Sequence, residues 1–230
     1  GTTPFWVANS GTNVATLYSV SPATGDIQKA ALVVSVPMPS GVVFNGGGGF
    51  PLNLGFSTPA ARFIFAGLDG NIYGWHPAHG TQAILAATGT PPAIYTGITI
   101  ANNGVRDLLY AASPVSPGRI DVYGPDFTPV TLGAGAFRDP ALPAGDTPFN
   151  ISNLGGTLYV TYTGPTGVVN EFDANGRLIR RIATGGTLFS PWGIALAPPT
   201  FGPFANALLI GNFNRGNATN GPGYISAYDR

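Results

Sequence analysis

The chain has 230 residues, of which 9% are charged, 44% are hydrophobic and 11% are aromatic, and this excludes a disordered, highly charged protein. Ten Lys and Arg side chains balance ten Asp and Glu side chains, so no basic field attracts phosphates and a nucleic-acid partner is not expected. Cysteine is absent, which excludes disulfides and zinc–thiolate sites.

The composition also bears on location. No apolar stretch approaches the ~20 residues that a membrane helix needs, so we expect no membrane insertion. Lys29 is the single lysine and Glu171 the single glutamate, while Gly, Thr, Asn and Pro are abundant. Because this composition is associated with extracellular proteins, we expect a secreted or extracellular protein.

Short β-branched and aromatic runs recur in pairs along the chain and predict β-hairpins. The first runs of the pairs cover residues 5–8, 63–66, 108–111, 158–161 and 208–211. The second runs, most with the pattern Gly-x-Ile/Val-x-x-aromatic, cover residues 15–20, 70–75, 118–123, 167–172 and 223–228. Asp69-Gly70 and Asn175-Gly176 supply the tight turns that such hairpins need.

Two further runs flank the hairpins. One precedes them at residues 39–43, 95–99, 148–152 and 191–195, and another follows them at residues 31–34, 83–86, 129–132 and 178–182. The unit is therefore four strands in about 50 residues, which is typical of one blade of a β-propeller. This pattern predicts eighteen strands in all.

The distribution of apolar residues within one run favours a propeller over a two-layer sandwich. Ile72 and Trp75 lie three positions apart and therefore point to opposite faces of a strand. A blade is covered by neighbouring blades on both faces, whereas a sandwich strand usually has one wet face. We expect an all-β fold: one β-propeller domain over residues 1–230, with five blades of four antiparallel strands, one strand missing at each end, and a sixth blade if flanking sequence is missing.

Several segments are specific enough to point to a family. The most specific is Ser-Pro-Trp-Gly-Ile-Ala-Leu-Ala-Pro at residues 190–198, and others lie at residues 3–9, 41–45, 142–145, 148–151 and 158–162. On these segments, nearly the whole chain resembles an uncharacterised secreted family with NHL-like β-propeller repeats. Because members have a further Pro-Trp-Gly strand upstream and more sequence downstream, the resemblance implies a six-bladed ring, and it implies no catalytic residues.

The two histidines are candidates for a ligand or metal site. His76 and His79 are three residues apart and could bind a metal or exchange protons. Pro77 and Gly80 favour a turn here, and no acidic residue lies nearby in the sequence. Exposed turn residues are therefore the simpler interpretation.

A propeller can also bind ligands or calcium at its axis with single side chains from separate blades. The candidates, chosen because they lie at strand ends, are Asn9, Asp107, Asp146, Asn150 and Asn212. Each is equally compatible with a turn or cap. No cofactor is evident in the sequence, although calcium fits this arrangement.

Trp192 stands out among the aromatic residues, because it lies at a strand start beside Pro191, where the central opening of a propeller is commonly lined. Trp6 and Trp75 lie inside apolar runs, where packing between blades is the simpler role. Among the sequons, Asn217 is the better candidate for glycosylation, because Asn150 falls within a predicted inner strand.

We expect a binding or structural interaction module, with a carbohydrate, a surface polymer or a protein as its partner. The alternative is a metal-dependent hydrolase or lyase of the lactonase-like propeller type, with its site in the central channel; that alternative rests on fold analogy. A third hypothesis is assembly through exposed blade edges, since unpaired strands invite β-augmentation.

Overall fold

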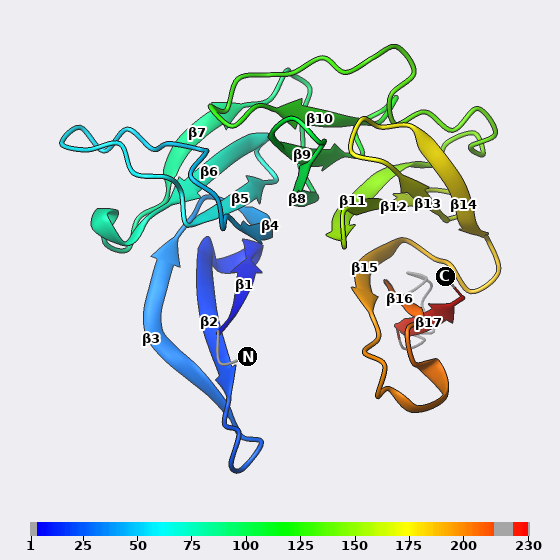
Figure 1. Ribbon diagram of the computed structural model, residues 1–230, viewed down its shortest axis with the longest axis horizontal. Helices are drawn as coiled ribbons and strands as arrows, with labels where there is room; N and C mark the ends of the chain where they lie inside the picture. The colour runs from blue at the N-terminus through cyan, green and yellow to red at the C-terminus, as the bar shows by residue number, and fades with distance from the viewer. Residues whose placement is uncertain (1–3, 214–222, 230) are drawn as a thin grey trace.

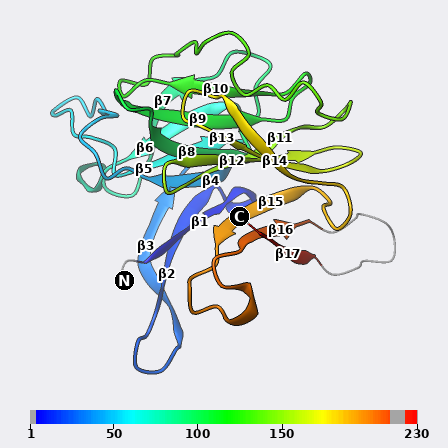
Figure 2. The same ribbon diagram turned by 45° about the vertical axis from the view of Figure 1, so that its right-hand side comes forward.

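Five antiparallel β-sheets follow one another along the chain and stand side by side around a central axis (Figure 1). The structure is a computed structural model and describes residues 4–213 and 223–229. Each sheet is one blade of a β-propeller, and the five blades form an arc that is open between the first and the last (Figures 1 and 2). The predicted fold class is confirmed.

The strands of each sheet are consecutive in the sequence, and their order in the sheet goes from the axis outward. The first sheet contains β1 (Phe5–Asn9), β2 (Val14–Val20) and β3 (Ile27–Ser35), and the second contains β4 (Pro39–Phe44), β5 (Phe63–Gly67), β6 (Asn71–Trp75) and β7 (Ile84–Thr88). The third contains β8 (Gly97–Asn102), β9 (Asp107–Ser113) and β10 (Arg119–Tyr123). The fourth contains β11 (Thr147–Leu154), β12 (Thr157–Thr163), β13 (Val168–Phe172) and β14 (Leu178–Thr184), and the fifth contains β15 (Pro191–Leu196), β16 (Leu208–Asn212) and β17 (Tyr224–Tyr228).

The described residues include three short 3-10 helices between strands: η1 (Ser10–Thr12), η2 (Pro77–His79) and η3 (Gly202–Phe204). Within residues 4–213 and 223–229, no helix has the length and apolar character to cross a membrane. The predicted hairpin turns are confirmed. Gly70 and Gly176 adopt positive φ angles of 76° and 80° between the strands that they connect.

One predicted strand is wrong. Residues 129–132 do not form a fourth strand of the third sheet, and only Pro129 makes an isolated bridge, to Tyr123. The chain then turns away because Phe137 packs on the fourth sheet, 5.3 Å from Phe172 between ring centroids, and donates its backbone N–H to Gly176 O. The described residues therefore contain seventeen strands, one fewer than predicted.

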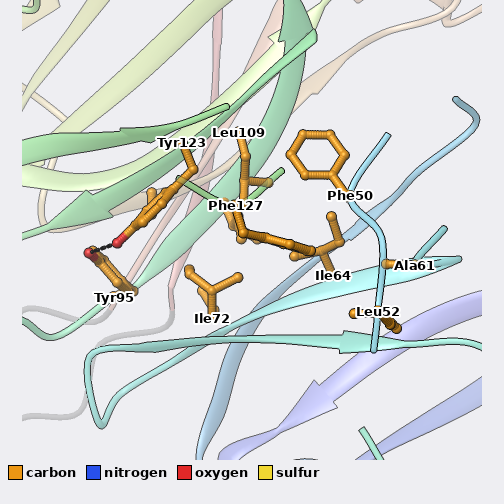
Figure 3. Close-up of a cluster of buried hydrophobic side chains, with 12 residues drawn as sticks. Phe50, Leu52, Ala61, Ile64, Ile72, Tyr95, Leu109, Tyr123 and Phe127 are labelled. Atoms are coloured by element: carbon orange, nitrogen blue, oxygen red, sulfur yellow. Dashed lines mark hydrogen bonds between the residues drawn. The ribbon is translucent and has the colours of Figure 1, made fainter. Parts of the chain in front are cut away.

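The second, third and fourth sheets are covered on both faces, as the apolar pattern predicts. Ile72 packs in a cluster of buried side chains between the second and third sheets (Figure 3), whereas Trp75 packs between the first and second. Two further clusters fill the spaces between the third and fourth sheets and between the fourth and fifth. The core is thus a series of four layers between blades instead of one central core.

Asp139 links the loop after β10 to the fourth sheet. Its carboxylate accepts hydrogen bonds from Arg181 Nη2 at 2.5 Å, Asn170 Nδ2 at 3.0 Å and the Ala141 backbone N–H at 2.9 Å. Burial by itself would raise the pKa of Asp139, but the bonds from Arg181, Ala141 and Asn170 outweigh burial and hold the pKa below its usual value.

Asp139 should therefore contribute to acid sensitivity. Because its folded pKa lies below the unfolded value of about 3.9, its stabilising effect is present above that pH and is lost as the pH falls through the folded pKa. In urea unfolding at a series of pH values, Asp139→Asn should lower the stability at neutral pH and flatten the loss of stability below pH ~4. An unchanged acid slope would contradict this role.

The inner strands β8 and β11 approach one another closely at Gly97. A Cβ atom at this position would overlap Asn150 Oδ1 and lie 2.8 Å from Asn150 Cα, and a backbone atom cannot move aside easily. Gly97→Ala should lower the free energy of unfolding by about 1–3 kcal/mol. Gly48→Ala is the matched control, because nothing lies within 4 Å of an added Cβ there; equal effects of the two substitutions in urea unfolding would argue against the close approach.

Candidate functional site

The inner strands β4, β8, β11 and β15 surround the axis, and three of them begin with a β-bulge. In β4, β11 and β15 the pairing register skips one residue after the first proline, and the skipped residues are Ser40, Phe149 and Trp192. Thr96 lies at the corresponding position just before β8. Since a bulge turns its extra residue out of the regular alternation, these side chains reach the axial opening or a neighbouring blade.

Hydrogen bonds from this region connect the second, third and fourth blades each to the blade that follows. Ser40 Oγ donates to Tyr95 O at 2.5 Å, and Thr96 Oγ1 donates to Phe149 O at 2.6 Å. Asn150 Nδ2 donates to Trp192 O, also at 2.6 Å. The starts of β8, β11 and β15 are therefore each fixed by a polar side chain of the preceding blade.

Trp192 lies across the axis. Its indole Nε1–H donates to Thr96 O at 2.7 Å, so a side chain of the fifth blade reaches the third blade. It lines two separate cavities, one of about 280 Å³ at the start of the inner strands and one of about 470 Å³ further along the axis. The indole thus lies between the two cavities.

The smaller cavity, which we call the axial cup, has an aromatic wall. Its lining residues are Ala8, Ser10, Pro39, Ser40, Leu68, Thr96, Phe149, Trp192 and Phe213. The Phe213 ring packs 5.7 Å from Phe149 and 6.5 Å, edge to face, from Trp192. The described lining contains three hydroxyl groups but no ionisable side chain, so the cup is suited to an uncharged ligand with an apolar face.

The larger axial cavity is also largely apolar. Asn150 and Ser152 are the polar side chains among its described lining residues, and the others are aliphatic or glycine apart from Trp192. Asn150 Oδ1 accepts the Ile151 backbone N–H, so both ends of this amide already have partners. Across the part of the chain that the structure describes, no group of three or more His, Cys, Asp or Glu residues is placed to hold a metal ion.

Of the predicted site residues, the structure brings Trp192 and Asn150 together at the axis. Asn9 donates to Thr16 Oγ1 within the β1–β2 hairpin, and Asn212 Oδ1 accepts the backbone N–H of Phe189 in the segment before β15. Neither residue lies among the lining residues of the two axial cavities.

The remaining predicted residues lie outside the described axial lining. Asp107 accepts a hydrogen bond from Asn102 Nδ2. Asp146 accepts hydrogen bonds from the backbone N–H groups of residues 166 and 167. His76 Nδ1 accepts the Ala78 N–H, and His79 Nδ1 lies 2.9 Å from Gln82 O, both in the turn between β6 and β7. Asn217 lies outside the described residues.

Sequence reasoning identified only Trp192 of the nine residues that line the axial cup, and among those it missed are Ser40, Thr96, Phe149 and Phe213. The first three occupy the second position of the repeated Pro/Tyr-x-Gly/Asn segment, the position that Trp192 holds in its own copy. Alignment of the four copies would therefore have identified them. Phe213 has no equivalent signal, because it follows β16 and reaches the cup only through the fold.

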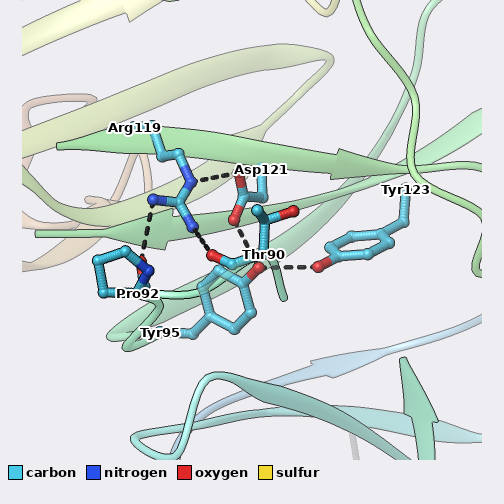
Figure 4. A network of polar contacts seen from close by, with 6 residues as sticks. All are labelled: Thr90, Pro92, Tyr95, Arg119, Asp121 and Tyr123. Atoms are coloured by element: carbon cyan, nitrogen blue, oxygen red, sulfur yellow. Dashed lines mark hydrogen bonds and ion pairs between the residues drawn. The ribbon is translucent and has the colours of Figure 1, made fainter. Parts of the chain in front are cut away.

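A further polar cluster joins the loop after β7 to β10 of the third sheet (Figure 4). The Tyr95 hydroxyl donates to Asp121 at 2.6 Å and lies 2.7 Å from the Tyr123 hydroxyl, while Arg119 Nε donates to Asp121 at 2.7 Å. Arg119 also donates to Thr90 O at 2.6 Å. Burial raises the pKa of both tyrosines and so favours the neutral phenols, and the hydrogen bonds of the cluster connect the second and third blades.

No family model matches the chain. In sequence it is similar to three uncharacterized proteins of Acanthamoeba polyphaga mimivirus. One is 29% identical over 186 residues, which cover 73% of this chain and 34% of that protein. The others are 25% and 26% identical over 97% of this chain and 62% and 58% of their own lengths. The chain thus spans between 34% and 62% of the length of these relatives.

Two solved structures share the architecture. The "putative 6-phosphogluconolactonase" of Bacteroides uniformis matches with a TM-score of 0.54 and 15% identity, over 98% of this chain and 67% of that one. A protein of unknown function from Bacteroides caccae matches with a TM-score of 0.55 and 13% identity, over 98% and 73%. At this identity the similarity shows the fold alone.

Trp192→Phe should distinguish the contribution of the indole hydrogen bond to stability from the contribution of the bulk of the ring. The substitution keeps an aromatic ring at the axis but leaves Thr96 O without its donor, and we expect a loss of about 1–2 kcal/mol in the free energy of unfolding. Urea unfolding measures it. A variant as stable as the original chain would show that the indole bond does not hold the third and fifth blades together.

Proposed function

We propose that this protein is an extracellular β-propeller binding module, and that the axial cup takes one ring of a carbohydrate or surface polymer. The observation that carries the proposal is the convergence of Phe149, Trp192 and Phe213 on one small cavity. A sugar ring has an apolar face of C–H groups that can pack on an aromatic ring, and its hydroxyl edge can meet polar groups at the rim.

The volume and polarity of the cup support a single uncharged ring. Its volume of about 280 Å³ lies just below the usual range of ligand sites, about 300–1,000 Å³, and leaves room for one ring. Ser40 and Thr96 use their hydroxyl protons on backbone carbonyl groups, but each oxygen can still accept a hydrogen bond from a ligand hydroxyl. A charged group would meet no counter-charge among the described lining residues.

The extracellular location and the NHL-like repeat assignment belong to the same proposal. The location is supported by the scarcity of charged residues, and the repeat assignment by the recurring Pro/Tyr-x-Gly/Asn inner strands. A glycan at Asn217 and a protein partner at the blade edges would both fit an extracellular module. Recovery of the protein from the medium or the outer surface of its host cells would support the location, and recovery inside the cells would oppose it.

A second candidate function is a metal-dependent lactonase-like hydrolase or lyase with its site in the central channel. It is favoured by the structural similarity to the Bacteroides uniformis protein and is weakened by the axial lining, in which no described residue is an acid, a base or a histidine. A calcium ion there would have to rely on carbonyl, amide or hydroxyl oxygens. Elemental analysis of the purified protein, together with an assay of 6-phosphogluconolactone turnover with and without calcium, tests this candidate.

Binding by the axial cup can be tested on its outermost ring. Phe213 is 54% exposed and contributes one wall, so Phe213→Ala should weaken binding of a neutral oligosaccharide identified on a glycan array by 10-fold or more without unfolding the chain. Phe204→Ala is the matched control, because Phe204 is 53% exposed and does not line the cup.

Calorimetric titration of the array hit gives the affinities. Equal affinity of both variants and the original chain would exclude the cup as the site. Turnover of the lactone, combined with no glycan binding, would favour the second candidate.

A further inference from the structure

The outer edge of β10 differs from the equivalent edges in the second and fourth sheets. There the third strand is paired along its length by a fourth strand: β6 by β7, and β13 by β14. In the third sheet the segment after β10 lies against the end of that strand: Val130 N donates to Val122 O at 2.8 Å, and Pro129 forms an isolated bridge with Tyr123. The third sheet therefore has an unfinished outer edge.

The open part of this edge is at Ile120. The Val122 carbonyl points away from β9, because it accepts the Val130 N–H. Alternate residues of a strand direct their backbone groups to the same side, so the N–H and C=O of Ile120 also point outward. Among the described residues, no strand lies beside them.

A cavity of about 470 Å³ occupies the position where a fourth strand would lie. β10 forms one wall, with Ile120 and Val122, and the loop at residues 129–137 forms the other. This loop contains Gly-Ala-Gly-Ala at residues 133–136, whose small side chains leave the space open. Because Phe137 packs on the fourth sheet, the loop is kept away from β10.

The neighbouring blades show which chemistry fits this position. Ile120 is the counterpart of Ile72 and Val169 in the repeated Gly-x-Ile/Val pattern. Ile72 pairs with Ala87 of β7, and Val169 pairs with Ala183 of β14. In both blades, then, an extended strand that carries aliphatic side chains places an alanine opposite this residue.

We propose that the edge of β10 is a peptide-binding site, which takes an extended aliphatic segment with a small residue opposite Ile120 as the fourth strand of the blade. Main-chain hydrogen bonds to Ile120 supply the affinity, and the cavity beside Val122 and Val130 takes the side chains. Thr88 and Thr90 line the same cavity from the second blade and limit the width of the segment. This site is independent of the axial cup.

The probe is a labelled nine-residue peptide with the sequence of residues 177–185, Arg-Leu-Ile-Arg-Arg-Ile-Ala-Thr-Gly, added to the full chain. Fluorescence anisotropy should show saturable binding, and a peptide carrying Ala183→Pro should bind at least 10-fold more weakly, because proline lacks the N–H that the edge needs. Equal binding of the two peptides, or no binding of either, would overturn the proposal.

A variant of the cavity provides the second test. Ala134→Phe places a large side chain in the cavity and should weaken peptide binding at least 10-fold. Ala144→Phe is the matched control, because Ala144 is also exposed and does not line the cavity, and it should bind as the original chain does. Equal affinity of the two variants would overturn the proposal.

Hydrogen exchange of the original chain places the peptide without relying on a variant. The amide of Ile120 should become at least 10-fold better protected on peptide addition, while amides of β1 and β17 keep their exchange rates. Protection at β1 or β17 in place of Ile120 would overturn the assignment to β10. Loss of protection in β14 would also overturn it, because it would show that the peptide has replaced that strand.

Discussion

The fold depends on apolar packing between successive sheets. The second, third and fourth sheets are covered on both faces. The clearest case is β6, where Ile72 packs toward the third sheet and Trp75 toward the first. Such a strand leaves little place for charge, which accounts for a chain in which only 9% of residues are charged. Because the layers repeat, each blade stabilises its neighbours and no single core dominates.

The axis adds a second constraint, which concerns polar groups. The inner strands approach closely enough that Gly97 has no room for a side chain beside Asn150. Near this point Ser40, Thr96 and Asn150 each donate to a carbonyl group of the next blade. The bulge at the start of β15 takes Trp192 out of the regular alternation and turns its side chain into the channel. The architecture of the axis thus creates the aromatic cup.

Where the repeat is broken, the molecule acquires different surfaces. In the second and fourth sheets the fourth strand completes the blade, but after β10 the chain leaves for the fourth sheet, where Phe137 and Asp139 hold the loop. The cavity beside Ile120 is the consequence. The two cavities therefore arise from opposite causes. The axial cup depends on regular repetition of the inner strand, and the cavity beside Ile120 on the loss of the outer strand.

The sequence by itself determined the repeat, the strand order within each blade and the two-sided burial, because hydrophobic periodicity and Gly-containing turns are local properties. It also identified Trp192 and Asn150, which stand in the repeated segment at the axis. The tertiary structure alone decided that Phe213 joins Trp192 and that residues 129–132 leave the edge of β10, since both depend on contacts between residues far apart in the chain. It likewise decided that Asn9 and the two histidines bond within their own hairpin or turn, and that Asn212 accepts a hydrogen bond from the segment before β15. Spacing shows that a polar residue ends a strand, but only the packed blades show whether its side chain meets the axis or its own backbone.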